Sequence, residues 1–110
     1  MTNKDVAVLF VQNFCESKID LLGPLLTETF RLSGPFFECQ SREEYLQKLK
    51  EHPPEEAIFN IINCFEDGEQ VCLVYDYTKA ASTTTIAQLF QFRDQKISEI
   101  QLIFDGRGFI

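Results

Sequence analysis

The second half of the chain consists of strand-like runs joined by connections too short for anything except hairpins. Residues 58–65, 71–78, 83–93 and 97–104 are rich in β-branched and aromatic side chains. The turn signals between these runs are Asp67-Gly68, Ala80-Ala81-Ser82 and Asp94-Gln95. Because connections this short join only antiparallel neighbours, the pattern predicts a four-stranded antiparallel meander.

The first half of the chain predicts helices. Apolar residues recur at helical spacing over residues 5–16, and Asp20 can cap a short helix over residues 21–26. Ser41 to Glu44 have the form of a capping box, which predicts a third helix that ends before Pro53. Two short strands are expected at 29–32 and 36–39. Helices followed by a sheet are typical of the α+β class.

Charge and length exclude several classes of function. The 110 residues carry a formal net charge of −7, which disfavours binding to nucleic acid and to anionic membranes. The length suits one domain, which we expect to span residues 1–110. The apolar run Val6–Val11 is too short to cross a membrane, and no signal-peptide cleavage pattern follows it, so we expect a cytoplasmic protein.

The four cysteines match neither a redox motif nor a zinc site. Successive cysteines lie 24, 25 and 8 residues apart. We therefore expect four reduced structural thiols and no metal or other cofactor. Cys64 and Cys72 are the pair that can face each other across a hairpin, because they flank the Asp67-Gly68 turn.

Two of the expected strands are apolar on both faces, at 58–62 and 102–104. Such strands are usually covered on both sides, and the expected helices can cover only one. A second copy of the same sheet is the simplest cover for the other side, so the sequence predicts a homodimer formed through the sheet.

Two stretches of the chain carry a family resemblance, namely QSREEYLQKL and LFQFRDQKISEIQLIFDGRGF. They resemble the third-helix segment and the last hairpin of the NTF2-like superfamily, specifically its SnoaL-like members. The resemblance implies a strongly curved, mainly antiparallel sheet that packs around N-terminal helices and leaves a conical pocket, usually in a homodimer. Members include ketosteroid isomerases, polyketide cyclases, epoxide hydrolases and non-catalytic binding modules, so the fold alone does not decide the function.

The resemblance also implies a candidate catalytic residue, Asp105. The matching position in SnoaL-like cyclases faces the pocket and acts as general acid/base, and an apolar pocket would raise the pKa of this carboxyl. The alternative is that Asp105 is a solvated strand terminator that pairs with Arg107.

Asp76 is a second candidate, because aspartate is unusual in the middle of a strand. Strand alternation places it on the face opposite Tyr75 and Tyr77, whose hydroxyls can polarise a carbonyl oxygen. Either Asp76 or the two tyrosines can therefore line the pocket. His52 is expected to cap the third helix, and it can act as a base only if its loop reaches the pocket mouth.

Two family mechanisms do not match the sequence. Ketosteroid isomerases carry a catalytic aspartate on the first strand, whereas residues 30–35 contain no carboxylate. Limonene-type epoxide hydrolases pair an arginine with an aspartate on one strand, and the arginine is missing around Asp76.

These observations predict a domain that binds an apolar or aromatic small molecule, with Tyr75, Tyr77, Phe59, Phe90 and Phe92 as candidate ligand contacts. An isomerase or cyclase reaction through Asp105 and Asp76 is one possibility. The alternative is a non-catalytic dimeric interaction or ligand-binding module, which a cavity filled by phenylalanine side chains such as Phe65 would favour. The sequence leaves open whether the chain is catalytic.

Overall fold

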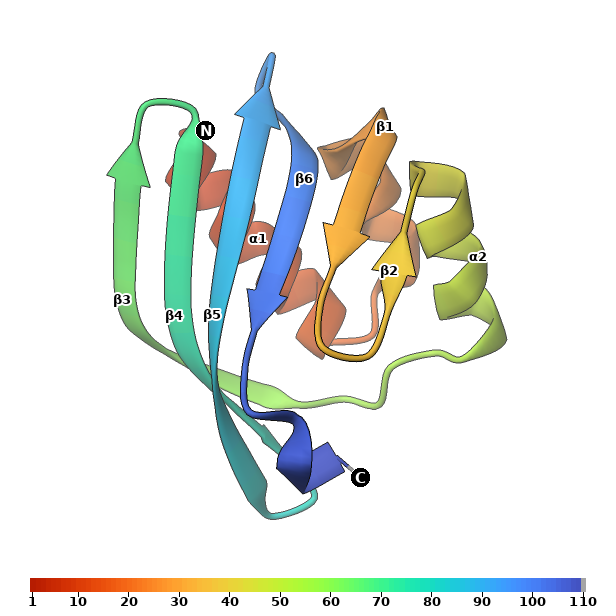
Figure 1. The fold of residues 1–110 in the computed structure, drawn as a ribbon, viewed down its shortest axis with the longest axis vertical. Coiled ribbons are helices and arrows are strands. Elements are labelled where there is room, and N and C mark those ends of the chain that lie inside the picture. Colours follow the sequence, from red (N-terminus) through yellow and green to blue (C-terminus); the bar gives the residue numbers. More distant parts are fainter. Residues whose placement is uncertain (110) are drawn as a thin grey trace.

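The computed structural model describes residues 1–109 and confirms an α+β architecture (Figure 1). The helices are α1 (Asn3–Cys15) and α2 (Arg42–Glu51), with short 3-10 helices η1 (Ile19–Leu21), η2 (Gly23–Leu25) and η3 (Gly106–Phe109). The strands are β1 (Leu26–Ser33), β2 (Glu38–Cys39), β3 (Ile58–Asp67), β4 (Gln70–Lys79), β5 (Ser82–Arg93) and β6 (Lys96–Ile103).

Side-chain caps determine where the two α-helices begin. Thr2 and Asp5 form a reciprocal capping box, with hydrogen bonds of 3.1 and 3.0 Å, so α1 begins earlier than the apolar pattern alone predicted. The Ser41 hydroxyl accepts a hydrogen bond from the Glu44 backbone N–H at 3.1 Å, as the sequence predicted for α2. The short helix expected at 21–26 is confirmed only as one turn of 3-10 helix, η2, which follows η1. The missing N–H of Pro24 prevents η1 and η2 from joining into one α-helix.

The six strands form one sheet in the order β2-β1-β6-β5-β4-β3. The predicted meander β3–β6 is confirmed, and β1 joins it by pairing parallel to β6. Both central residues of the β4–β5 turn are left-handed, with φ of 51° at Ala80 and 66° at Ala81. Asp94 and Gln95 repeat this geometry between β5 and β6, which is the turn that matches the twist of tight hairpins.

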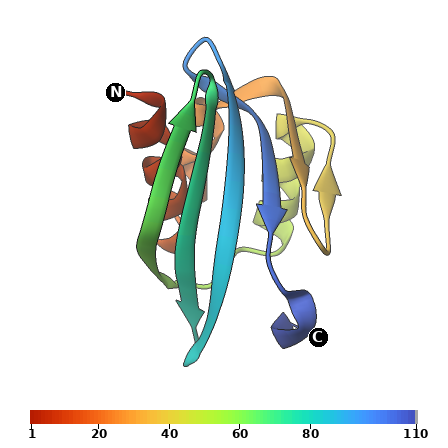
Figure 2. The ribbon, with the colours of Figure 1, turned by 60° about the vertical axis from the view of Figure 1, so that its left-hand side comes forward.

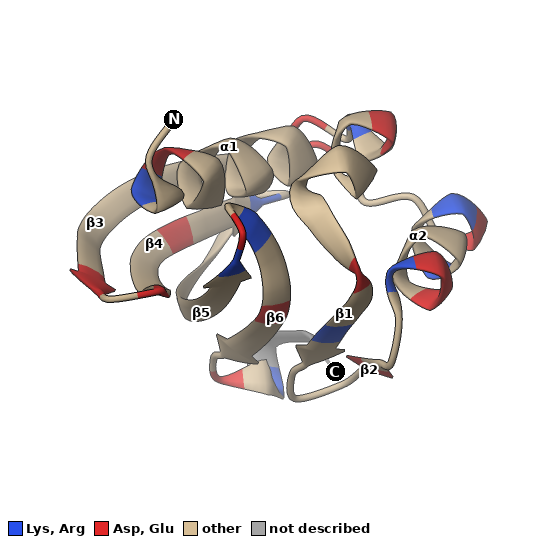
Figure 3. Ribbon diagram, turned by 90° about the horizontal axis from the view of Figure 1, so that it is seen from above, with Lys and Arg blue, Asp and Glu red and all other residues tan. Residues whose placement is uncertain are grey.

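The sheet is strongly curved, and both α-helices lie on its inner side (Figures 2 and 3). The core therefore forms between α1, α2 and the inward side chains of β1, β4, β5 and β6. Phe10 of α1 meets Phe90 edge-on at 6.1 Å and stacks on Tyr45 at 6.4 Å between ring centroids. These aromatic contacts join both helices to the sheet.

The outer face of the sheet carries exposed apolar side chains. Phe65 lies opposite Cys72, and Ile103 lies opposite Ala87 in the strand register. Phe65 and Ile103 are 59% and 49% exposed, and Ile58 at the start of β3 is 73% exposed. No helix of the described chain covers this face (Figure 3).

The strand register corrects one expectation about the cysteines. Cys64 lies opposite Leu73, whereas Cys72 lies opposite Phe65. Neighbouring strand positions point to opposite faces, so Cys64 and Cys72 do not face each other across the hairpin. All four cysteines carry free thiols.

Membrane-spanning helices and metal-binding clusters are both absent from residues 1–109. No helix in this range has the length and apolarity that a membrane crossing requires. Within the same residues, no group of histidine, cysteine and acidic side chains is placed to hold a metal ion.

Candidate functional site

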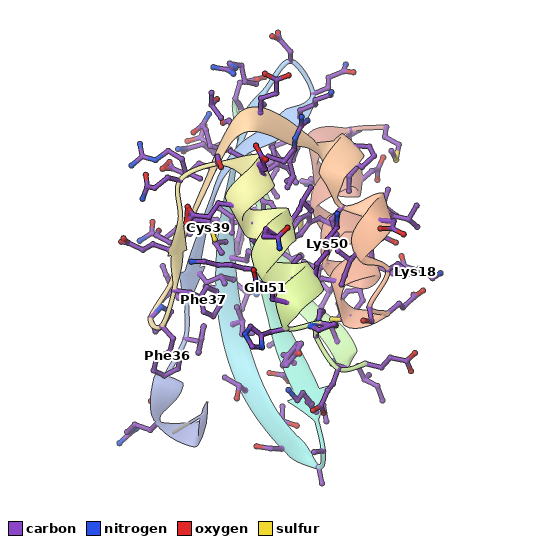
Figure 4. All side chains as sticks on the ribbon, turned by 90° about the vertical axis from the view of Figure 1, so that its right-hand side faces the viewer. Lys18, Phe36, Phe37, Cys39, Lys50 and Glu51 are labelled. Atoms are coloured by element: carbon purple, nitrogen blue, oxygen red, sulfur yellow. The ribbon has the colours of Figure 1, made fainter. Side chains whose placement is uncertain are left out.

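A cavity of about 590 Å³ lies between the inner face of the sheet and the two α-helices. Its wall is mainly aromatic and aliphatic. The apolar side chains that line it are Phe10, Val11, Phe14, Leu32, Phe36, Phe37, Leu49, Pro54, Ile86, Leu102 and Phe104. Figure 4 looks onto α2, which forms one wall of the cavity beside the β1–β2 segment that carries Phe36, Phe37 and Cys39.

A buried hydrogen-bonded pair interrupts the apolar wall. The Tyr75 hydroxyl donates to Gln88 Oε1 at 2.6 Å, and the two residues are 4% and 3% exposed. Burial raises the pKa of Tyr75, so the phenol stays neutral and remains a donor. Among the described residues, the Gln88 Nε2 group has no hydrogen-bond partner, and Gln88 lines the cavity. This amide can therefore donate to an oxygen inside the cavity.

Tyr45 and Tyr77 add two further hydroxyls to the cavity wall. Tyr45 is 6% exposed, and burial raises the pKa of both tyrosines. Neither hydroxyl has a hydrogen-bond partner within residues 1–109. Both phenols are thus neutral groups that can bind a carbonyl or hydroxyl oxygen.

Charged residues and an aromatic loop surround the mouth of the cavity. Lys48, Glu51, His52 and Lys79 belong to its lining. The C-terminal end of α2, the β1–β2 loop and η3 all lie toward the lower end of Figure 1. Phe36 of that loop meets Phe104 edge-on at 6.1 Å.

The Phe36 ring also explains one glycine near the mouth. A Cβ atom on Gly106 would lie 2.5 Å from the tip of the Phe36 ring. The absence of a side chain at Gly106 therefore lets the C-terminal segment pack closely against this loop.

The structure places Asp105 outside the cavity lining. Its carboxylate forms a two-point ion pair with Arg107, at 2.6 Å between Oδ2 and Nη2, and the side chain is 57% exposed. These hydrogen bonds lower the pKa of Asp105, so the expectation of a raised pKa is wrong. The apolar surroundings that would have raised it are absent at this position.

Asp76 also points away from the cavity, and it accepts a hydrogen bond from the Thr85 hydroxyl at 2.7 Å. Tyr75 and Tyr77, one position to either side, line the cavity. Asp76 and the two tyrosines thus lie on opposite faces, as alternation predicted, and the tyrosines are the ones that face the cavity.

The three candidate phenylalanines are not part of the cavity lining. Phe90 and Phe92 are 1% and 2% exposed and stack on each other in the core at 6.3 Å. Phe59 contacts Tyr75 edge-on at 6.2 Å and packs beside the cavity wall. Phe65 is exposed on the outer face, so none of these four rings fills the cavity.

Gln88 and Tyr45 are lining residues that the sequence did not indicate, and His52, for which the sequence left a role at the pocket mouth open, lines the cavity as well. Gln88 carried a usable signal. It is polar, yet it stands between Ile86 and Phe90 on the inward positions of β5. Tyr45 gave no such signal, because an aromatic residue on the apolar face of a helix usually belongs to the core.

The amino-acid sequence of this protein matches that of a known domain family. The model of the SnoaL-like domain matches residues 8–100. The chain belongs to the SnoaL-like domain family. No curated protein matches the sequence of this SnoaL-like domain at the significance required.

Solved structures confirm the NTF2-like fold of this SnoaL-like domain. An NTF2-like protein of unknown function from Cytophaga hutchinsonii superposes with a TM-score of 0.84 at 22% identity, covering 99% of this chain and 95% of that one. TerC, crystallised with polyporic acid, gives 0.78 at 14% identity over 97% and 94% of the chains. An LEH-like epoxide hydrolase of M. tuberculosis gives 0.78 at 13% identity over 94% and 82%. At these identities the likeness shows the fold alone.

Proposed function

We propose that this SnoaL-like domain binds an apolar or aromatic small molecule in the cavity on the inner face of its sheet. The observation that carries the proposal is the Tyr75–Gln88 pair in the wall of a 590 Å³ cavity whose other lining is mainly apolar. Small-molecule sites commonly combine such a wall with a few positioned polar groups. TerC, which has the same fold, was crystallised with polyporic acid, and this supports a small-molecule ligand here.

The non-catalytic interaction module with a filled cavity has less support. That alternative depends on phenylalanine side chains that occupy the inside of the curved sheet. Phe90 and Phe92 pack in the core, and neither Phe59 nor Phe65 enters the cavity lining. The space therefore remains for a ligand.

An isomerase or cyclase reaction at this site would need a proton-transfer group other than Asp105, which lies outside the cavity lining. His52 is the candidate, because its loop reaches the cavity and an imidazole has one nitrogen that can accept a proton and one that can donate it. In such a reaction the Gln88 amide, held in place by the Tyr75 hydroxyl, would orient a carbonyl oxygen, and His52 would move the proton. Binding is the primary function proposed here, and catalysis through His52 is the second candidate.

Binding can be tested with the neutral fluorescent probe phenylnaphthylamine. Leu102 lines the cavity, and Ile103, the next residue of β6, is 49% exposed on the outer face. Leu102→Trp fills the cavity and should weaken probe binding by roughly 10-fold or more. Ile103→Trp is the matched control and should bind as the wild type does. A Leu102→Trp protein that is folded by circular dichroism and binds the probe with unchanged affinity would contradict the proposal.

The proposal includes a homodimer formed through the outer face of the sheet. On this face Val74, Ala87 and Ile103 lie in one cross-strand row, beside a row that contains Phe65 and Cys72. Contiguous exposed apolar surface of this kind marks interaction sites, and a two-fold axis would bury the same patch of both copies. Light scattering should give about twice 12.7 kDa for the wild type and a monomer for Ile103→Lys. A wild-type monomer at micromolar concentration would contradict the dimer.

A further inference from the structure

The charge of the cavity wall is concentrated at one end. The lining residues with ionic or imidazole side chains are Lys48, Glu51, His52 and Lys79. The remaining lining residues are apolar, apart from three tyrosines, Gln88 and Cys39. Glu51 ends α2, His52 is its C-cap, and Lys79 ends β4. These ends lie toward the same side of the molecule in Figure 1. A ligand thus meets charge at the mouth and only neutral groups deeper in the cavity.

The charged side chains at the mouth differ in whether they already have partners within the protein. The Lys48 ammonium donates to the Glu38 carbonyl oxygen at 3.0 Å and lies 3.6 Å from the Glu44 carboxylate. The Glu51 carboxylate accepts a hydrogen bond from Gln47 at 3.2 Å. Lys79, by contrast, makes no ion pair or hydrogen bond through its ammonium with any residue in the range 1–109. A free ammonium is therefore present at the mouth of a protein whose net charge is −7.

The polar groups inside the cavity are neutral, and they favour an uncharged part of a ligand. Gln88 Oε1 already accepts from Tyr75, so the pair offers the Gln88 N–H groups to a ligand. The Tyr45 and Tyr77 hydroxyls add further donors. An anionic group placed there would be desolvated with no cation beside it, whereas a neutral acceptor oxygen would be satisfied.

From this polarity we infer that the ligand is an amphipathic organic anion with an aromatic or polycyclic body, a neutral acceptor oxygen that faces Tyr75 and Gln88, and a carboxylate at the mouth beside Lys79. The inference rests on the proposed function and specifies its ligand class. A partly exposed ammonium near a carboxylate contributes modestly, so we expect Lys79 to account for roughly 3- to 10-fold in affinity.

The test uses two fluorescent probes that share one ring system and differ in charge. Anilinonaphthalene sulfonate is an anion that stands in for the carboxylate ligand, and phenylnaphthylamine is its neutral counterpart. The wild type should bind the sulfonate more tightly than the amine, and added salt should reduce the difference.

Lys79→Gln should lower the affinity for the sulfonate by roughly 3- to 10-fold and so remove its preference, and should change the affinity for the neutral probe by a smaller factor. Lys96→Gln is the matched control. Lys96 begins β6, at the end of the sheet opposite the end of β4 (Figure 1), and this variant should change neither affinity.

Equal binding of the two probes by the wild type would overturn the inference, as would a Lys79→Gln protein that keeps the preference or loses both affinities equally. The proposed function fails in a different way, through probe binding that Leu102→Trp does not reduce. Binding that Leu102→Trp blocks but that shows no charge preference would leave the proposed function intact and exclude the anionic ligand.

Discussion

The inner face of the sheet is buried and lines the cavity, whereas the outer face is exposed, although their residues alternate along the same strands. On β4, Tyr75 is 4% exposed and lines the cavity, whereas the Asp76 carboxylate bonds to Thr85 on the outside. On β6, Leu102 lines the cavity, and Ile103 is 49% exposed. One residue of offset therefore separates the wall of the cavity from the outer surface, and both helices contribute to the inner side alone.

The curvature of the sheet causes this difference in burial between the two faces. Bending brings the inward side chains of β4, β5 and β6 toward α1 and α2, so even polar groups such as Gln88 become buried there. In a single chain the outer side chains spread apart and stay in contact with water. Equivalent substitutions on the two faces should consequently have very different effects.

The largest difference should come from matched phenylalanines. Phe90 is 1% exposed on the inner face, and Phe65 is 59% exposed on the outer face. Phe90→Ala should lower the free energy of unfolding by about 3–5 kcal/mol, because it leaves a cavity in a packed core. Phe65→Ala should change it by less than about 0.5 kcal/mol in dilute protein. Urea denaturation of both variants measures these values.

The same pair also tests whether the outer face is covered. A destabilisation by Phe65→Ala that increases with protein concentration would show that a second copy buries this ring. Equal effects of the two substitutions in dilute protein would contradict the distinction between the faces.

A smaller difference is expected for the neighbours Tyr75 and Asp76. Tyr75→Phe removes the donor to Gln88 Oε1 and leaves a buried acceptor unsatisfied, which should cost about 1–3 kcal/mol of stability. Asp76→Asn keeps an oxygen for Thr85 and should be close to neutral in the same denaturation experiment. A folded Tyr75→Phe protein as stable as the wild type would show that the pair is solvated.

The smallest effect should come from Asp105 at the end of the sheet. Its ion pair with Arg107 lowers its pKa below the ordinary value of 3.8. The stability that this carboxylate contributes is therefore present above pH 3.8 and is lost as the pH falls through the lowered folded-state pKa. Because the ion pair is exposed to solvent, this contribution is small, so Asp105→Asn should lower stability at neutral pH only slightly and leave probe affinity unchanged.

NMR titration of the Asp105 carboxyl carbon should give a midpoint below 3.8. A midpoint above this value, or a loss of probe binding in Asp105→Asn, would return Asp105 to the site.

The sequence by itself determined the local structure and the alternation. Hairpin connections such as Ala80-Ala81 leave no room for any pairing except antiparallel, and the Ser41 cap marks the start of α2. Alternation also required Asp76 and the tyrosines beside it to separate onto opposite faces. These features depend on neighbours within a few residues, which is why the sequence carries them.

Only the tertiary structure decided which face is the inner one and which distant residues meet there. Tyr45 and His52 reach the cavity because α2 packs beside β1. Asp105 lies outside the cavity lining, because it follows the end of β6 and its carboxylate pairs with Arg107. The curvature that encloses the cavity is the sum of contacts between segments far apart in the chain. No local pattern of residues encodes such a sum, so the site had to be read from the fold.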